Sequence, residues 1–276
     1  NRRLIIRART LNEDEAERLK SKRNLFRQVA LARASALVVP SRTLEEVALG
    51  AWAQPSHRIR RIANGIDVAA YAVPPSADAI PGFVKREDEV VIGTLAGLRA
   101  VKNLPRQVRA VAPLGESVRM VIVGEGPERE AIHAQARALG IEDRVFMPGF
   151  LPNPSSYVGL FDIFALSSVS EQFPISLIEA MAAGLPVVST DVGDVRNMVS
   201  AENRGFIISD EDEGRFGAML SRMTGDESLR QTLGQANRAK AVAEYGEADM
   251  LARYSALYEQ AMGRPGALSG LEKRQR

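Results

Sequence analysis

The chain has no cysteine, only two histidines and a single tryptophan among its 276 residues. Without cysteine it can form neither a disulfide nor a thiolate metal site. No run of eighteen apolar residues occurs, so the sequence predicts no transmembrane helix. The apolar run at residues 4–6 is far too short for the apolar region of a signal peptide. These absences are compatible with a cytoplasmic protein, which is the location we expect.

Positive and negative charges nearly balance over the chain, but an excess of positive charge is concentrated in residues 1–33. The net charge is +2, yet residues 1–33 hold ten Arg or Lys and four Asp or Glu, a local net of +6. A basic, partly helical stretch of this kind, which we expect over residues 12–33, is usually a solvated helix face, and we favour that interpretation. The alternative is peripheral attraction to an anionic membrane or to a phosphorylated acceptor. Almost no aromatic residues lie among the basic ones, so we expect no nucleic-acid binding.

From residue 89 onward, short apolar runs rich in β-branched residues alternate with segments typical of helices. We expect strands over residues 90–94, 118–123, 144–147, 161–167, 186–190 and 205–208. Helices are expected over residues 104–114 and 128–139, from residue 175, and across 210–263. Continuous apolar strands separated by helices predict an α/β fold with a doubly wound parallel sheet that is buried on both faces.

Residues 167–186 carry two carboxylates, Glu171 and Glu179, with seven residues between them. Pro174 suits the first position of a helix and Gly184 suits the residue just past its end. Glu179 is then the only charge in an otherwise apolar helix. A buried carboxylate without a partner would cost on the order of several kcal/mol, or would take up a proton. Either a protein hydrogen bond or a ligand diol must therefore satisfy it.

This segment resembles the E-x7-E motif of retaining glycosyltransferases of family 4, which have the GT-B fold. The residues around the pair carry the resemblance: Ser170 and Glu171 before the helix, residues 179–188 within and after it, and residues 190–194 beyond. The resemblance extends to residues 63–67, which resemble the segment that closes the first domain of the family.

The resemblance implies a domain organisation. Residues 1–71 would be the remnant of an acceptor-side Rossmann-like domain that is largely missing, and residues 89–262 a complete nucleotide-sugar-binding Rossmann-like domain. Pro and Gly at residues 72–88 indicate a linker. Residues 263–276 lack apolar periodicity and are expected to be a disordered tail.

The resemblance also implies roles within the motif. Glu171 would contact the sugar ring of the donor, and Glu179 would hold the ribose hydroxyls. Backbone at Phe173, Pro174 and Ile175 would contact the donor at the start of the helix, where unpaired N–H groups favour an anion.

A second loop, residues 97–103, follows the first strand of the block, where a doubly wound sheet places ligands. It resembles the family's Arg- and Lys-bearing segment, which implies that Lys102 and Arg99 stabilise the departing diphosphate. Aligning on Lys102 puts Gly97 where the family has its Arg, so Arg99 would have to reach back. The base of the nucleotide should stack near Met147. Residues 145–148, which contain Met147, otherwise look like the ordinary end of a buried strand.

The resemblance implies metal-independent transfer of a sugar, with retention, from a nucleotide-diphosphate sugar to a glycan or lipid-linked acceptor, as in polysaccharide biosynthesis. The donor is a substrate, and no further cofactor is expected. The one literal Asp-x-Asp, Asp210 to Asp212, is interpreted as the start of a surface helix. His57 and His133 are interpreted as incidental. Two alternatives stay open: nucleotide-sugar binding without transfer, and a GT-B sugar epimerase.

Overall fold

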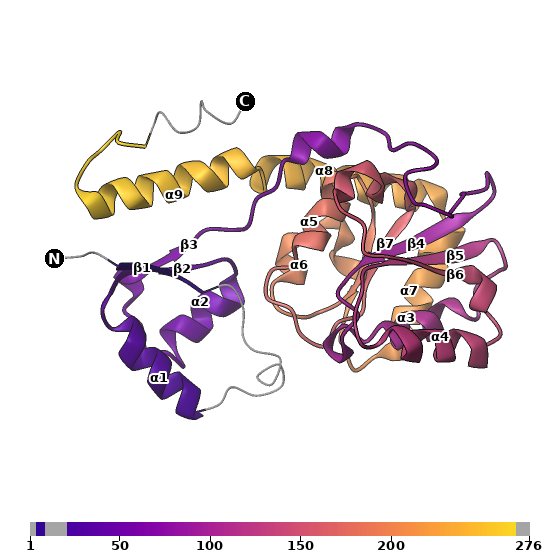
Figure 1. The fold of residues 1–276 in the computed structure, drawn as a ribbon, viewed down its shortest axis with the longest axis horizontal. Helices are drawn as coiled ribbons and strands as arrows, with labels where there is room; N and C mark the ends of the chain where they lie inside the picture. Colours follow the sequence, from indigo (N-terminus) through magenta and orange to yellow (C-terminus); the bar gives the residue numbers. More distant parts are fainter. Residues whose placement is uncertain (1–3, 9–20, 269–276) are drawn as a thin grey trace.

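The structure is a computed structural model that describes residues 4–8 and 21–268. The described residues form two units, one built on a three-stranded sheet and one on a six-stranded sheet, and residues 62–89 connect them (Figure 1). Every strand pairing in both sheets is parallel. The predicted α/β class with a parallel, doubly wound sheet is confirmed.

The six-stranded sheet has the order β6-β5-β4-β7-β8-β9. Its strands are β4 (Val90–Leu95), β5 (Val118–Val123), β6 (Val145–Gly149), β7 (Ile163–Leu166), β8 (Val187–Thr190) and β9 (Ile207–Ile208). All six strands expected from residue 89 onward are present. Because the order runs outward in both directions from β4 and β7, the chain reverses its winding between these two central strands.

Alternate residues of each strand enter different cores. Val91 and Phe164 belong to one cluster of buried residues, whereas their neighbours Ile92 and Ile163 belong to another. Each of these four side chains is completely buried. A strand that is buried on both faces must be apolar at every position, which explains why these strands show no polar alternation in the sequence.

Helices cover both faces of this sheet. They are α3 (Leu104–Val111), α4 (Arg129–Ala138), α5 (Ile175–Ala182), α6 (Val195–Met198), α7 (Glu213–Gly225) and α8 (Glu227–Glu244). The buried residues of α5 and α6 belong to one cluster, and those of α3, α4 and α7 to the other. Gly184, with φ of +78°, follows the end of α5 in the left-handed conformation expected of a glycine there.

The smaller unit contains β1 (Leu4–Arg7), β2 (Ala34–Val39) and β3 (Ile59–Arg61), in that order across the sheet, with α1 (Ser21–Leu31) and α2 (Arg42–Leu49). Strand β1 was not predicted. The core of this unit includes Trp52, which is only 2% exposed, and the fully buried Leu44 of α2. Ser41 begins α2 by accepting a hydrogen bond from the Leu44 amide at 3.0 Å.

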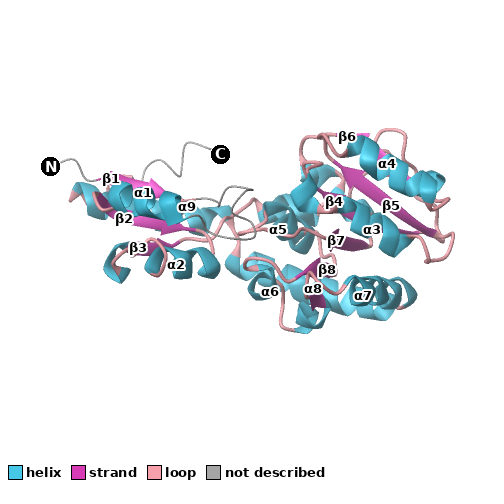
Figure 2. Cartoon of the chain, turned by 90° about the horizontal axis from the view of Figure 1, so that it is seen from below, coloured by secondary structure: helices cyan, strands magenta, loops and turns pink. Residues whose placement is uncertain are grey.

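The last helix, α9 (Glu247–Met262), returns to the smaller unit. It lies along one side of the three-stranded sheet, with α1 and α2 on the other side (Figures 1 and 2). Two backbone bonds fix this return: the Ile66 amide donates to the Tyr245 carbonyl at 3.0 Å, and the Glu247 amide to the Ile66 carbonyl at 2.8 Å. The prediction counted residues 247–262 with the second domain; in the structure this helix also contacts the smaller unit, where the Arg7 guanidinium lies over the Tyr254 ring.

The predicted linker is packed rather than free. Ile80 and Phe83 are each 1% exposed and lie in the core of the larger unit beside Val91. The expected disorder of residues 263–276 is wrong for residues 264–268, which form a turn in which the Leu268 amide donates to Glu259 at 2.8 Å. The rest of that tail lies outside the described residues, as does most of the helix expected over residues 12–33.

Across residues 4–8 and 21–268, none of the helices has both the length and the apolar character that crossing a bilayer demands.

Candidate functional site

The candidate site lies where β4 and β7 end, side by side at the centre of the larger sheet. The connections leaving these two strands run to opposite sides, which opens a crevice at their carboxyl ends. The loop after β4 carries Gly97, Arg99 and Lys102, and the loop after β7 carries Glu171. The sheet topology therefore brings two segments that are about 70 residues apart to one place, in line with parallel-sheet geometry.

A glycine turn after β5 supports the first of these loops. Gly124 and Gly126 have φ values of +145° and +158°, and a Cβ on Gly124 would lie 1.9 Å from the carbonyl oxygen of Ala96. The Leu98 amide donates to the Glu125 carbonyl at 2.9 Å. The two glycines of this turn thus allow two backbone segments to touch, which gives them a structural role.

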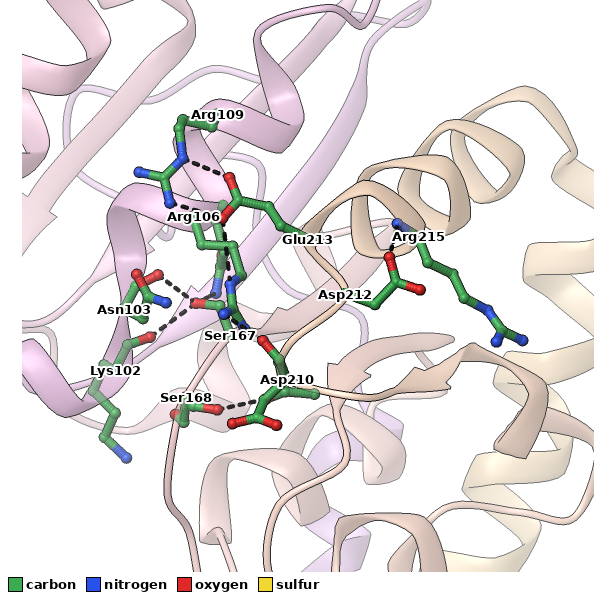
Figure 3. Close-up of polar contacts among 12 residues, drawn as sticks. Lys102, Asn103, Arg106, Arg109, Ser167, Ser168, Asp210, Asp212, Glu213 and Arg215 are labelled. Atoms are coloured by element: carbon green, nitrogen blue, oxygen red, sulfur yellow. Dashed lines mark hydrogen bonds and ion pairs between the residues drawn. The ribbon is translucent and has the colours of Figure 1, made fainter. Parts of the chain in front are cut away.

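Lys102 is positioned through its own backbone. The hydroxyl of Ser167 donates toward the carbonyl oxygens of Lys102 at 2.8 Å and Asn103 at 3.0 Å (Figure 3). The ammonium group of Lys102 forms an ion pair with the Glu171 carboxylate, and the Ser168 hydroxyl donates to the same carboxylate at 2.7 Å. The two charged side chains are 17% and 11% exposed. Their burial makes the pair sensitive to loss of either partner.

The loop after β8 fixes the backbone at Glu171. Gly193 has φ of +56°, and a Cβ there would lie 2.3 Å from the Glu171 carbonyl oxygen. The next amide, Asp194, donates to the Gln172 carbonyl at 3.3 Å. Gly193 therefore acts as a spacer that lets this loop press against the motif, a role that sequence reasoning did not assign.

A cleft of about 530 Å³ opens between the two units at this point. Its lining residues come from both units: Arg7, Asn64, Gly65, Lys102, Glu171, Gln172, Phe173, Pro174, Ile175, Ser176 and Met250. Five predicted site residues therefore share it: Lys102, Glu171, Phe173, Pro174 and Ile175. The helix α5 begins here at Ile175, so its first amides lie at the cleft.

Gln172 is the polar residue of the cleft that lacks a partner. The side chain is 8% exposed, and its carbonyl oxygen Oε1 is buried without a hydrogen bond among the described residues. A buried acceptor left unpaired costs roughly 1–3 kcal/mol.

The smaller unit and the connecting segment contribute residues to the cleft that the sequence did not reveal as functional. Arg7, at the end of β1, donates from Nη2 to Oδ1 of Asn64 at 2.7 Å, and its guanidinium lies 5.3 Å from the ring centre of Tyr254 on α9. Asn64 donates in turn to the carbonyl of Phe173 at 3.2 Å. This chain of contacts aims a second cation at the cleft from the unit opposite Lys102. The one signal was the turn at Asn64 and Gly65.

The other four predicted site residues, Gly97, Arg99, Met147 and Glu179, do not line the cleft. Arg99 is exposed, and Gly97, also exposed, lies beside the Arg99 guanidinium. Met147 is buried on β6, where its carbonyl oxygen accepts a bond from Arg129 at 2.8 Å. His57 and His133 also lie away from the lining residues of the cleft.

Glu179 lies one turn into α5, outside the cleft lining, and has a protein partner. The Tyr71 hydroxyl donates a hydrogen bond to its carboxylate, and Tyr157 is also close. Burial raises the pKa of Glu179 above its ordinary value near 4.5, and the Tyr71 bond partly opposes that change. The sequence left open two partners for the Glu179 carboxylate, a protein hydrogen bond or a ligand diol. The structure contains the protein hydrogen bond, from Tyr71.

The Asp-x-Asp segment makes hydrogen bonds within the fold at the start of a helix, as predicted. Asp212 accepts the Arg215 amide at 2.9 Å and so begins α7 (Figure 3). The Asp210 carbonyl accepts a bond from Arg106 at 2.5 Å, beside the pairing of Arg109 with Glu213. The described part of the chain holds no group of three or more residues suited to a metal ion.

Taken together, the cleft offers two cations, a carboxylate and a helix start. Cations and helix amides suit phosphate oxygens, and a carboxylate suits hydroxyl groups. A doubly wound Rossmann-like unit that faces a second parallel-sheet unit across such a cleft defines the GT-B class of fold.

The chain belongs to the glycosyl transferases group 1 family. The sequence model of that family matches residues 77–240, more than half of the chain. Among curated relatives, N-acetyl-alpha-D-glucosaminyl L-malate synthase of Bacillus anthracis is 26% identical over 207 residues, covering 74% of this chain and 54% of that protein. The Campylobacter jejuni N-acetylgalactosamine-N,N'-diacetylbacillosaminyl-diphospho-undecaprenol 4-alpha-N-acetylgalactosaminyltransferase is 31% identical over 158 residues, covering 57% and 43%. The chain spans about half the length of the curated relatives it matches.

Solved structures agree on the fold. Anabaena Alr3699/HepE in complex with UDP superposes with a TM-score of 0.83 at 20% identity, over 94% of this chain and 72% of that one. Sucrose-phosphate synthase from Thermosynechococcus elongatus gives a TM-score of 0.79 at 22% identity, over 92% and 64%. These likenesses establish the GT-B arrangement of the two units.

Proposed function

We propose that this protein transfers a sugar from a nucleotide-diphosphate sugar to a glycan or lipid-linked acceptor, with retention of the anomeric configuration and without a metal ion. The observation that carries the proposal is the convergence of Lys102, Glu171 and the start of α5 in one cleft between the units. Solved relatives in complex with UDP and UDP-glucose, and a relative whose acceptor is a diphospho-undecaprenol, support this class of donor and acceptor.

In this proposal the donor diphosphate binds Lys102 and the first amides of α5. The bond between the anomeric carbon and the diphosphate oxygen breaks, and its electron pair leaves with the diphosphate. The acceptor hydroxyl oxygen bonds to the anomeric carbon from the same face, and its proton passes to the departing phosphate oxygen. Glu171 holds the sugar ring, and Arg7 adds positive charge from the opposite unit.

The ribose is assigned to Glu179 by the motif, with Tyr71 as the group that the ribose hydroxyls would replace. The base is assigned to the end of β6 near Met147. Gly97 and Arg99 keep secondary roles at the diphosphate, because both lie on the loop of Lys102 although neither lines the cleft.

Calorimetric titration with UDP, GDP and ADP tests the donor site. Lys102→Ala should weaken binding of the preferred nucleotide about tenfold or more, since charged contacts are worth roughly 1.5–3 kcal/mol. Lys102→Arg should recover part of the loss. The matched control is Lys22→Ala, an exposed lysine on α1. Unchanged titration in Lys102→Ala would remove the residue from this role.

Turnover separates transfer from its alternatives. Consumption of the donor only when a saccharide acceptor is present supports transfer, and retention is read from the anomeric configuration of the product. Binding without consumption would assign nucleotide-sugar binding alone. Conversion of the donor to an isomeric sugar would assign an epimerase.

We also propose a cytoplasmic protein that touches an anionic membrane through α1. The helix exposes Leu25, Phe26 and Val29, which are 60%, 70% and 68% exposed, next to Lys22. Apolar residues flanked by cations are typical of interfacial helices. Co-sedimentation with phosphatidylserine vesicles should fall in the Phe26→Ser variant. Equal sedimentation of that variant would favour the solvated helix face.

A further inference from the structure

A second pocket, of about 480 Å³, lies between the units beside the donor cleft. It shares Phe173 with the cleft, and Ala63 in its wall precedes the cleft residue Asn64. We name it the interunit basic pocket after its five cations: Arg42, Arg61, Arg204, Lys240 and Arg253. None of these residues lines the donor cleft.

The cations come from three separate parts of the fold. Arg42 and Arg61 belong to the smaller unit, Arg204 and Lys240 to the larger one, and Arg253 to α9. Only two carboxylates, Asp194 and Glu244, line the same pocket, which leaves a formal net charge of +3. The whole 276-residue chain has a net charge of only +2, so this concentration does not follow from composition.

Both carboxylates of the pocket already have partners within the protein. Asp194 is 4% exposed and accepts the amides of Arg42 at 2.7 Å and Thr43 at 3.3 Å, which caps α2 across the boundary between the units. Glu244 lies 3.9 Å from Lys240. Arg61 pairs with Glu45 at 3.3 Å, at exposed side chains where such pairs are weak.

Three exposed guanidinium groups have no protein partner among the described residues. The side chains of Arg42, Arg204 and Arg253 form no hydrogen bond or ion pair there. Lys240, by contrast, donates to the carbonyls of Asn197 at 2.6 Å and Val199 at 3.1 Å, which fixes its ammonium group at the pocket. Burial lowers the pKa of Lys240, and Arg204 and Arg42 lower it further against the opposing effect of Glu244.

We infer that the interunit basic pocket binds a phosphate-bearing small molecule, and that the bound anion holds the two units together. Guanidinium forks match phosphate oxygens in geometry as well as in charge. A volume of about 480 Å³ accommodates a phosphorylated metabolite as well as the bare ion. Like charges contributed by both units repel until an anion lies between them. The inference is independent of the proposed transfer.

The test uses Lys102→Gln as the background, because pyrophosphate would also bind the donor cleft. Inorganic pyrophosphate, inorganic phosphate and glucose 1-phosphate are titrated calorimetrically at constant ionic strength. We expect saturable binding that falls about tenfold when Arg42→Gln or Arg253→Gln is added. Both side chains are exposed, so the fold should survive, which circular dichroism checks. The control is Arg137→Gln on α4, whose arginine pairs with Glu130 outside the pocket.

Thermal unfolding followed by Trp52 fluorescence gives a second readout. Trp52 lies in the core of the smaller unit, so an anion that joins the units should raise its transition temperature. A larger effect of glucose 1-phosphate than of inorganic phosphate would identify a phosphorylated metabolite, and equal effects would identify the phosphate group alone.

Three results would overturn the inference. The first is loss of all binding in Lys102→Gln alone, which would place the anion in the donor cleft. The second is an equal effect of potassium chloride at the same ionic strength. The third is equal weakening by Arg137→Gln.

Discussion

The two units are both built on parallel strands, yet their covering helices come from different parts of the chain. In the larger unit, the helices that cover both faces of the six-stranded sheet either lie between its strands in the sequence or, like α7 and α8, directly follow the last strand. In the smaller unit, α1 and α2 cover one side, and α9, almost 200 residues away, lies along the other. The larger unit is therefore covered by helices from its own continuous stretch of chain, whereas the smaller unit depends on distant sequence.

The largest expected effect tests the larger unit. Gly124→Ala would place a Cβ 1.9 Å from the Ala96 carbonyl at φ of +145°, so the backbone must move. We expect a loss of roughly 3 kcal/mol or more in the free energy of unfolding. Urea unfolding followed by far-ultraviolet circular dichroism measures it. The control is Gly140→Ala, at φ of +68° with open space around it, which should lose only about 1 kcal/mol. Equal losses would refute the close-approach argument.

The larger unit was predictable because its strands are apolar at every position and its helices are separated by glycine turns. The smaller unit was less so: β1 has four residues, and nothing local in the sequence marks it as a parallel partner of β2. The place of α9 was also hidden, since its contacts at Ile66 are backbone bonds across 180 residues. Such pairings depend on the folded chain, not on local propensity.

The next largest effect tests the dependence of the smaller unit on α9. A Cβ on Gly65 would lie 2.7 Å from the Gly246 carbonyl, where α9 begins. We expect Gly65→Ala to destabilise the smaller unit by about 2 kcal/mol. Trp52 fluorescence should then report unfolding at lower urea, while the circular dichroism of the larger unit changes little. Gly115→Ala, in open space, is the matched control. Coincident shifts of both probes would show that the units unfold as one.

A smaller effect concerns the contact between the units at Asp194. Asp194→Ala leaves the amides of Arg42 and Thr43 unpaired, so we expect the Trp52 transition to lose about 1–2 kcal/mol. Asp212→Ala removes a comparable cap within the larger unit and should instead affect circular dichroism, by about 1 kcal/mol. If both variants affect the same probe, Asp194 does not join the units.

The smallest effect concerns pH. Burial raises the folded-state pKa of Glu179, so its contribution to stability is full below its ordinary value near 4.5 and is lost as pH rises through the raised value. Glu179→Gln should remove this pH dependence. At pH 8, without nucleotide, the variant should melt at the same temperature or up to roughly 3 °C higher, whereas nucleotide affinity should fall about tenfold. A lower melting temperature with unchanged nucleotide affinity would give Glu179 a purely structural role.

The sequence indicated the part of the candidate site that lies in the larger unit, but not the part where the two units meet. Glu171 and Lys102 were proposed from the resemblance of their two segments to family motifs, and the structure brings the two side chains into contact. Arg7 and Asn64 were missed because their approach to the cleft depends on how the smaller unit sits against Phe173. Tyr71 was missed for the same reason: its hydroxyl reaches Glu179 from the connecting segment.

The return of α9 sets the order in which this protein can mature on the ribosome. The strand β1 is synthesised before the larger unit, but the helix that covers its sheet is synthesised after that unit. The nascent small sheet therefore has one uncovered side while the larger unit is being made. The donor cleft, which uses Met250 of α9, cannot close before that helix has emerged.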